Sequence, residues 1–205
     1  MTRKQIITIS GKPGSGKSST AAEVAKLLNY EHHSAGKIMR QMAEENSMSL
    51  AEINKFAKDN PEVDKKIDTY LQSLGERDGI VIDSRIAFHW IPHSFKVYLE
   101  LDSDIAAARI FKDMQSNRDR KGEIAMTIDA VWAQMQDRMM NEKRRYQKLY
   151  NVNPYARKNF DLIIHTERNN PLTVSLWILD RYKQWLKTSS WRQVVEKVPL
   201  GFSIK

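Results

Sequence analysis

The chain has 205 residues, of which 33 are Lys or Arg and 25 are Asp or Glu, giving a formal net charge of +8. Apolar residues form 41% of it, enough for one hydrophobic core, but no apolar run approaches the ~20 residues of a transmembrane helix. The absence of cysteine excludes a disulfide scaffold, a thiolate zinc site, an iron–sulfur cluster and a cysteine nucleophile. The basic start precedes too few apolar residues for a signal peptide, so we expect a cytoplasmic protein.

Short β-rich runs alternate with longer helical patterns along the chain. From the N-terminus, a strand at 4–9 precedes a helix at 18–28, and a strand at 31–34 precedes helices at 36–45, 50–58 and 63–74. Strands at 79–83 and 95–101 precede helices at 104–114 and 127–150, and a strand at 160–165 precedes a helix at 171–190. This alternation favours a three-layer α/β/α fold, with helices on both faces of a mostly parallel, five-stranded sheet.

No linker or repeat divides the chain, so we expect a single domain over residues 1–190. The segment 191–205 has no clear periodicity, and the sequence predicts neither an element nor a role for it.

The strongest motif follows the first predicted strand and matches G-x-x-x-x-G-K-[ST], the phosphate-binding P-loop. Its glycines let backbone N–H groups converge on a polyphosphate, and the helix that it opens adds a partial positive charge there. We expect Lys17 to reach the β- and γ-phosphates of ATP and the Ser18 hydroxyl to ligate Mg²⁺. The nucleotide-binding residues predicted here are Gly11, Lys12, Pro13, Gly14, Ser15, Gly16, Lys17, Ser18 and Ser19.

A P-loop also needs a second acid for the metal, typically at the end of a neighbouring strand. Asp83 closes the buried run 79–82 and is the best candidate. The alternative for Asp83 is a strand-end residue that only forms a turn.

The chain lacks the N-K-x-D and D-x-x-G motifs of a regulatory GTPase, which leaves a small-molecule kinase or an ATPase module. Two further motifs favour the kinase. Ser34-Ala35-Gly36-Lys37-Ile38-Met39-Arg40 begins 17 residues after the P-loop lysine, and Asp83-Ser84-Arg85 follows the third predicted strand. With these motifs the chain resembles the nucleoside monophosphate kinases, and more narrowly the cytidylate kinases of the archaeal type, over roughly residues 5–180.

The resemblance implies that Ser34, Gly36, Arg40, Asp83 and Arg85 hold the acceptor monophosphate, with residues 34–75 forming a helical acceptor-binding insertion. The residue types support this independently, because two guanidinium groups from separate elements can chelate a dianionic phosphate bidentately. The alternative for Arg40 is a solvated helix residue.

A kinase also needs a cover that excludes water and brings positive charge to the transferring group. Arg118, Arg120 and Lys121 surround a polar break that we interpret as a short lid at 115–125. Farther on, Arg138, Glu142 and Arg145 share one side of a long helix. By resemblance Arg109 lies against the ATP, and Arg138 and Arg145 contact phosphates. The alternative for each arginine is a salt-bridged helix face.

The sequence therefore predicts transfer of a phosphoryl group from Mg·ATP to a nucleoside monophosphate, CMP or dCMP in the first place. Kinases of the same fold acting on AMP, UMP or a non-nucleotide acceptor, and a nucleic-acid-stimulated ATPase, remain as alternatives. Asp113 stands where adenylate kinases carry a second lid arginine, which argues against AMP. We expect a monomer without nucleic-acid or membrane partners. Base selectivity stays open among Asn46, Asn54, Lys58 and Asp64.

Overall fold

The computed structural model describes residues 3–116 and 127–198, and its centre is a six-stranded sheet in the order β2-β3-β1-β4-β5-β6. All neighbouring strands in this sheet are parallel. The strands are β1 (Ile6–Gly11), β2 (Glu31–Ser34), β3 (Ile80–Asp83), β4 (Phe95–Glu100), β5 (Leu162–His165) and β6 (Val194–Lys197).

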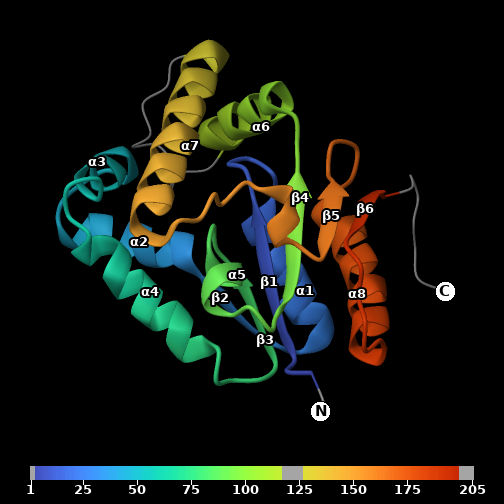
Figure 1. The fold of residues 1–205 in the computed structure, drawn as a ribbon. Coiled ribbons are helices and arrows are strands. Elements are labelled where there is room, and N and C mark those ends of the chain that lie inside the picture. The colour runs from blue at the N-terminus through green and yellow to red at the C-terminus, as the bar shows by residue number, and fades with distance from the viewer. Residues whose placement is uncertain (1–2, 117–126, 199–205) are drawn as a thin grey trace.

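Helices cover both faces of the sheet, as expected for parallel strands joined by helical crossovers. They are α1 (Lys17–Leu28), α2 (Ala35–Glu45), α3 (Leu50–Phe56), α4 (Glu62–Leu74), α5 (Ala87–Trp90), α6 (Ser103–Ser116), α7 (Ile128–Tyr150) and α8 (Pro171–Lys187), with a 3₁₀ turn η2 (Arg157–Asn159). In Figure 1, α6 and α7 lie above the carboxyl ends of the strands, and α2, α3 and α4 lie to one side. The predicted three-layer α/β/α class is confirmed.

The sheet is apolar on both faces, which explains why its central strands are fully buried. On one face Ile7 and Ile9 pack with α1 and α8. On the other face Ile6 and Ile82 pack with helices α2 to α5. Because the two cores share one sheet, the carboxyl ends of its strands are held in a fixed arrangement on which a site can be built.

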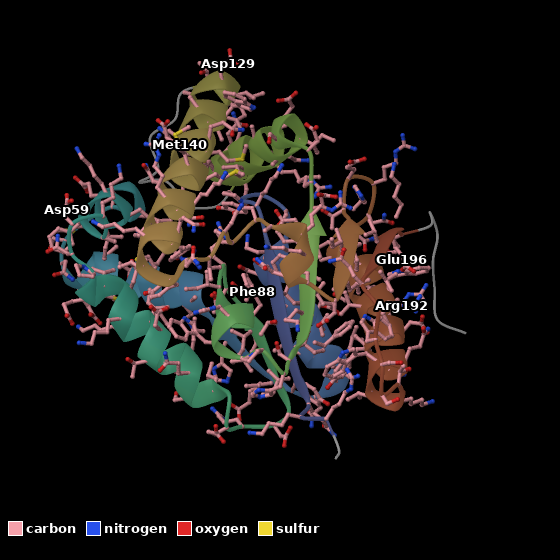
Figure 2. All side chains as sticks on the ribbon, in the orientation of Figure 1. Asp59, Phe88, Asp129, Met140, Arg192 and Glu196 are labelled. Atoms are coloured by element: carbon pink, nitrogen blue, oxygen red, sulfur yellow. The ribbon has the colours of Figure 1, made fainter. Side chains whose placement is uncertain are left out.

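The expected number of strands is wrong by one, because part of the segment 191–205 forms β6. This edge strand pairs with β5 through Leu162 opposite Val194. Its four residues alternate between half-buried and exposed, so they lack the buried apolar run from which β1, β3, β4 and β5 were predicted. Figure 2 shows Glu196 of β6 beside α8, where its carboxylate accepts hydrogen bonds from Arg181 and from the indole N–H of Trp177.

Local capping explains where two helices of the segment 34–75 begin. Ser34 caps α2 by accepting from the backbone N–H of Lys37. Ser49 and Glu52 form a reciprocal capping box at the start of α3. Both cap residues lie on the expected helix boundaries, whereas the short helix α5 was not predicted.

None of the helices in the described ranges is long and apolar enough to cross a membrane. Of the lid expected at 115–125, residues 117–125 lie outside the part of the chain that the structure describes, and with them Arg118, Arg120 and Lys121.

The aromatic cluster beneath α8 yields a prediction about stability. Trp185 is 4% exposed and packs against Phe95 and Tyr182 with ring centroids 5.3 and 5.9 Å apart. Replacing it with alanine leaves a large cavity, so we expect Trp185→Ala to lower the free energy of unfolding by about 3–5 kcal/mol in urea titrations. Leu172→Ala on the exposed side of α8 is the control. A loss below about 1 kcal/mol at Trp185 would contradict this packing.

Candidate active site

The loop between β1 and α1 has the geometry of an anion-binding cradle. Gly14 and Gly16 adopt φ angles of 74° and 85°, which only glycine adopts without strain. A Cβ on Gly14 would lie 2.7 Å from the carbonyl oxygen of Ala106, so a side chain there would push the loop off α6. The buried Ser15 hydroxyl oxygen has no hydrogen-bond partner among the described residues. Backbone and hydroxyl groups are thus available to an anion at the N-terminus of α1.

Lys17 extends along this loop from the first turn of α1. Its Nζ donates to the carbonyl oxygen of Lys12 at 3.0 Å, and the side chain is buried. Burial and the nearby positive charge of Arg85 lower the pKa of Lys17 well below its usual range, against the opposing effect of Asp83. An anion in the cradle would stabilise the charged ammonium, so the environment of Lys17 suits a phosphate ligand.

Asp83 ends β3 directly beside the end of β2, where Ser34 is its register partner. Its two carboxylate oxygens contact the Ser34 hydroxyl at 3.1 Å and the His32 Nε2 at 3.0 Å. Burial alone would raise the pKa of Asp83, but the His32 hydrogen bond and the charge of Lys17 hold it below its usual value. Asp83 is therefore an ionised carboxylate in a fixed orientation.

Gly36 and Arg40 lie in the first turns of α2, immediately after Ser34. The Arg40 guanidinium folds back toward the start of its helix, within 3.7 Å of the position that a Gly36 Cβ would occupy. The Ser34 hydroxyl lies 3.8 Å from the same position. Arg40 is exposed and makes no hydrogen bond or ion pair with another described residue, so its donors are available.

Arg85 and Arg138 come from different elements and meet at the buried carboxylate of Glu142. The Nε atoms of Arg85 and Arg138 lie 2.8 and 2.9 Å from the two carboxylate oxygens of Glu142. The Tyr155 hydroxyl donates a further hydrogen bond to Glu142. Burial would raise the pKa of Glu142, but the charges of the two arginines hold it far below its usual range.

Arg145 lies one turn beyond Glu142 on α7 and has a different partner. Its Nε is 3.1 Å from an Asp64 carboxylate oxygen on α4, and its Nη1 donates to the carbonyl oxygen of Asn54 on α3 at 3.4 Å. Arg145 therefore joins α7 to two helices of the segment 34–75.

Two cavities flank the P-loop. The first, here called the α7 cavity, has a volume of about 470 Å³ and lies between Pro13 of the loop and residues of α3, α6 and α7, including Arg138, Glu142 and Arg145. The second, here called the P-loop cavity, has a volume of about 430 Å³ and is lined by residues 14–20, Arg109 and residues of the segment 166–174.

The predicted arginines are divided between these cavities. Arg138 and Arg145 line the α7 cavity, whereas Arg109 lines the P-loop cavity and donates to the carbonyl oxygens of Thr166 and Glu167 at 2.8 and 2.9 Å. Arg85 reaches the α7 cavity wall through its bond to Glu142. The structure does not bring all three predicted catalytic arginines into one cavity.

The four residues considered for base recognition, Asn46, Asn54, Lys58 and Asp64, do not lie in one place. Asn54 and Lys58 line the α7 cavity. Asp64 is buried against Arg145, and Asn46 is exposed and donates to the carbonyl oxygen of Met42 at the end of α2. Asn54 and Lys58 are therefore the two of the four that border a cavity directly.

Three residues of the site were not assigned by the sequence. Glu142 was recognised only as an acid between two arginines, and its spacing of four from Arg138 was the available signal. Tyr155 and His32 contact Glu142 and Asp83 across long sequence separations, for which the sequence has no local signal.

The sequence of this chain is similar to one family model and to several known proteins. A family model described as an AAA domain matches residues 10–129. A cytidylate kinase of Halobacterium salinarum is 35% identical over 85% of this chain and 88% of its own length, and one of Methanopyrus kandleri is 33% identical over 80% and 85%. A cytidylate kinase of Pyrobaculum islandicum is 32% identical over 83% and 90%. The chain belongs to the cytidylate kinase family. It is therefore a phosphotransferase.

Solved structures confirm the fold of this cytidylate kinase family member at lower identity. A shikimate kinase from Acinetobacter baumannii, in complex with shikimate, has a TM-score of 0.59 at 16% identity over 88% of this chain and 94% of its own. A shikimate kinase from Bacteroides thetaiotaomicron has the same TM-score at 13% identity, over 90% and 99%. The arrangement of sheet and helices is thus shared with other P-loop kinases.

Glu142 yields a prediction about stability and pH. Glu142→Gln leaves the largely buried Arg85 and the partly exposed Arg138 without their shared counter-charge, so we expect a loss of about 3 kcal/mol of unfolding free energy at pH 7. Since folding lowers the pKa of Glu142, its stabilisation is present above about pH 4.5 and declines as the pH falls below that value. The variant should therefore lose less stability than the wild type between pH 5 and pH 3, measured by urea unfolding.

The exposed Glu44→Gln on α2 is the control for this measurement, and it should follow the wild-type profile. An equal acid sensitivity of Glu142→Gln and wild type would show that Glu142 is not the ionised partner of both arginines.

Proposed function

We propose that the protein transfers the γ-phosphoryl group of Mg·ATP to CMP or dCMP, giving ADP and CDP or dCDP. Membership of the cytidylate kinase family supports this choice of acceptor. The observation that carries it is the P-loop cradle with two cavities beside it, one lined by Arg109 and the other by Arg138 and Arg145. Two substrates that meet at a P-loop need such a pair of sites.

In this proposal the kinase domain expected at residues 1–190 also includes the edge strand β6, with 34–75 as the acceptor-binding insertion and 115–125 as a lid. Residues Gly11 to Ser19 hold the donor phosphates, and Arg109 contacts the donor from the P-loop cavity. Ser34, Gly36, Arg40 and Arg85 hold the acceptor phosphate. Arg138 and Arg145 close over the transferring group from the α7 cavity, where Arg145 also contacts the acceptor phosphate.

The residues present also fit a magnesium ion carried with the nucleotide. No group of three or more His, Asp or Glu in the described ranges is arranged to hold a metal by itself. Mg²⁺ in kinases keeps several waters and the substrate phosphates, so the Ser18 hydroxyl and the ionised Asp83 provide the number of protein oxygens it requires. When bound, the ion neutralises phosphate charge.

The chain needs no general base for this reaction, because a phosphate oxygen of the acceptor is already ionised near neutral pH. The task of the protein is to align donor and acceptor and to stabilise the charge of the transferring group. Buried positive charges act more strongly here than they would in water, and Lys17, Arg85 and Arg145 are all buried or nearly so.

The P-loop assignment is tested with Lys17→Ala. We expect phosphoryl transfer to fall by at least about 10³-fold, because the charge that contacts the β- and γ-phosphates is removed. Circular dichroism and urea unfolding should show an intact fold. Lys26→Ala, an exposed basic residue in the last turn of the same helix, is the matched control and should keep full activity. Near-normal turnover of Lys17→Ala would refute the assignment.

The acceptor is identified by an assay of ADP release across CMP, dCMP, UMP, AMP and shikimate. We expect the highest kcat/KM with CMP or dCMP.

In the same assay Arg40→Ala should raise the KM for CMP about 10–100-fold, because one charge-assisted contact to the acceptor phosphate is lost, with the KM for ATP unchanged. Lys37→Ala on the same helix is the control. A higher kcat/KM with AMP or UMP would contradict the proposed acceptor. ATPase activity stimulated by DNA or RNA would contradict the proposed kinase reaction.

A further inference from the structure

Helix α4 carries two buried carboxylates one turn apart, and they have different partners. Asp64 is 2% exposed and Asp68 is 6% exposed. A buried carboxylate is costly unless it is paired, so each partner indicates what the residue does. Asp68 accepts hydrogen bonds from the Trp90 indole N–H at 2.9 Å and from the Tyr150 hydroxyl. In the described part of the chain Asp68 makes no ion pair, so its contacts only fasten α4 to its neighbours.

Asp64 instead faces the Arg145 guanidinium. The distance from Arg145 Nε to Asp64 Oδ2 is 3.1 Å, and both atoms are buried without a hydrogen-bond partner in the described residues. The other side of Arg145 lies over the Tyr146 ring at 5.1 Å, and its Nη1 contacts the Asn54 carbonyl oxygen. Contacts from three helices thus fix the guanidinium where it borders the α7 cavity.

We propose that Asp64 is a positioning residue of the acceptor site, whose carboxylate orients Arg145 toward the monophosphate in the α7 cavity. This inference rests on the proposed function, since it names a residue that serves the same site. Asp64 itself does not line the cavity, and it acts only through Arg145. The ion pair also joins α4 of the segment 34–75 to α7, the helix that carries Arg138 and Glu142. The two helices therefore hold their charged residues in a fixed relative position.

The protonation of Asp64 gives this role a distinctive pH dependence. Burial raises the pKa of Asp64 to about 6, the charge of Arg145 opposes the rise, and the charges of Asp68 and Glu142 add to it. From α7, Tyr146 also contacts Arg145. Two further helices pack on α4. On α5, His89 contributes a charge that lowers the pKa of Asp68. The buried residues of α2 are Met39 and Ala43, which do not titrate.

These groups determine the pH range in which the Asp64–Arg145 ion pair is present. Above about pH 6 Asp64 is ionised and holds Arg145, and below that pH it becomes neutral and releases the ion pair. A phosphate monoester itself titrates near pH 6, so the wild-type KM alone would mix two effects. The ratio of variant to wild-type KM cancels the titration of the substrate.

The test compares Asp64→Asn with wild type, using the monophosphate that the wild-type enzyme accepts. We expect the KM ratio for the acceptor to be about tenfold at pH 8 and to approach one at pH 5, with the KM for ATP unchanged. Asp64→Glu should recover most of the loss. Asp68→Asn, the matched buried carboxylate one turn away, should give a ratio near one at pH 8, because Asp64 still holds Arg145 there and the loss of the Asp68 charge only lowers the pKa of Asp64. Calorimetric Kd values for the acceptor without ATP should show the same pattern.

A second pair of variants covers the case in which Asp64→Asn does not fold. Arg145→Gln leaves Asp64 as a buried carboxylate that can take up a proton instead of staying charged, and the double variant Asp64→Asn, Arg145→Gln leaves neither charge of the pair. Since Asp64 acts through Arg145, we expect the two to share one acceptor KM. A further rise in the double variant, or a pH-independent ratio for Asp64→Asn, overturns the inference. Absence of turnover and binding with every monophosphate would instead refute the proposed function, and this inference with it.

Discussion

The buried carboxylate of Glu142 is the counter-charge that lets the positive residues of the site coexist without a ligand. Arg85 follows a strand of the sheet and Arg138 lies on α7, yet both Nε atoms lie within 3 Å of Glu142 oxygens. Without this carboxylate the guanidinium groups of Arg85 and Arg138 and the buried ammonium of Lys17 would repel one another. A site that must receive dianionic phosphates therefore contains its own negative charge, and this charge also joins α7 to the sheet.

The distribution of charge explains the basic character of the chain. Several of the excess positive residues are buried beside the P-loop or line one of two cavities, and the arginines among them are Arg85, Arg109, Arg138 and Arg145. Small anionic substrates can enter such cavities, whereas a nucleic-acid backbone requires an exposed positive track. The net charge of +8 is thus consistent with the proposed reaction on nucleotides.

The sequence predicted most of the fold because its signals are local. The P-loop, the helical periodicity of the long helices and the buried runs of β1, β3, β4 and β5 depend on residues that are close in the chain. Strand β6 was not predicted because an edge strand of four residues, such as Val194–Lys197, has no buried run of its own. Of the site, the sequence identified the arginines but not their partners. Asp64 and Arg145 are 81 positions apart, and only the packing of α4 against α7 brings them into contact.

The close approach of Gly14 to the Ala106 carbonyl oxygen has a consequence for how the two cavities differ. Because the P-loop packs directly on α6, Arg109, less than one turn beyond Ala106, lies on the helix that supports the phosphate cradle. The P-loop cavity, which the proposed function assigns to the donor, is therefore bounded by two elements in direct contact. The α7 cavity, which the proposed function assigns to the acceptor, is bounded by α3, α6 and α7. The Asp64–Arg145 ion pair links α7 to its neighbour α4. A substitution at Asp64 or Arg145 would therefore alter the contact between helices beside the α7 cavity, whereas the P-loop cavity depends on a backbone contact of Gly14.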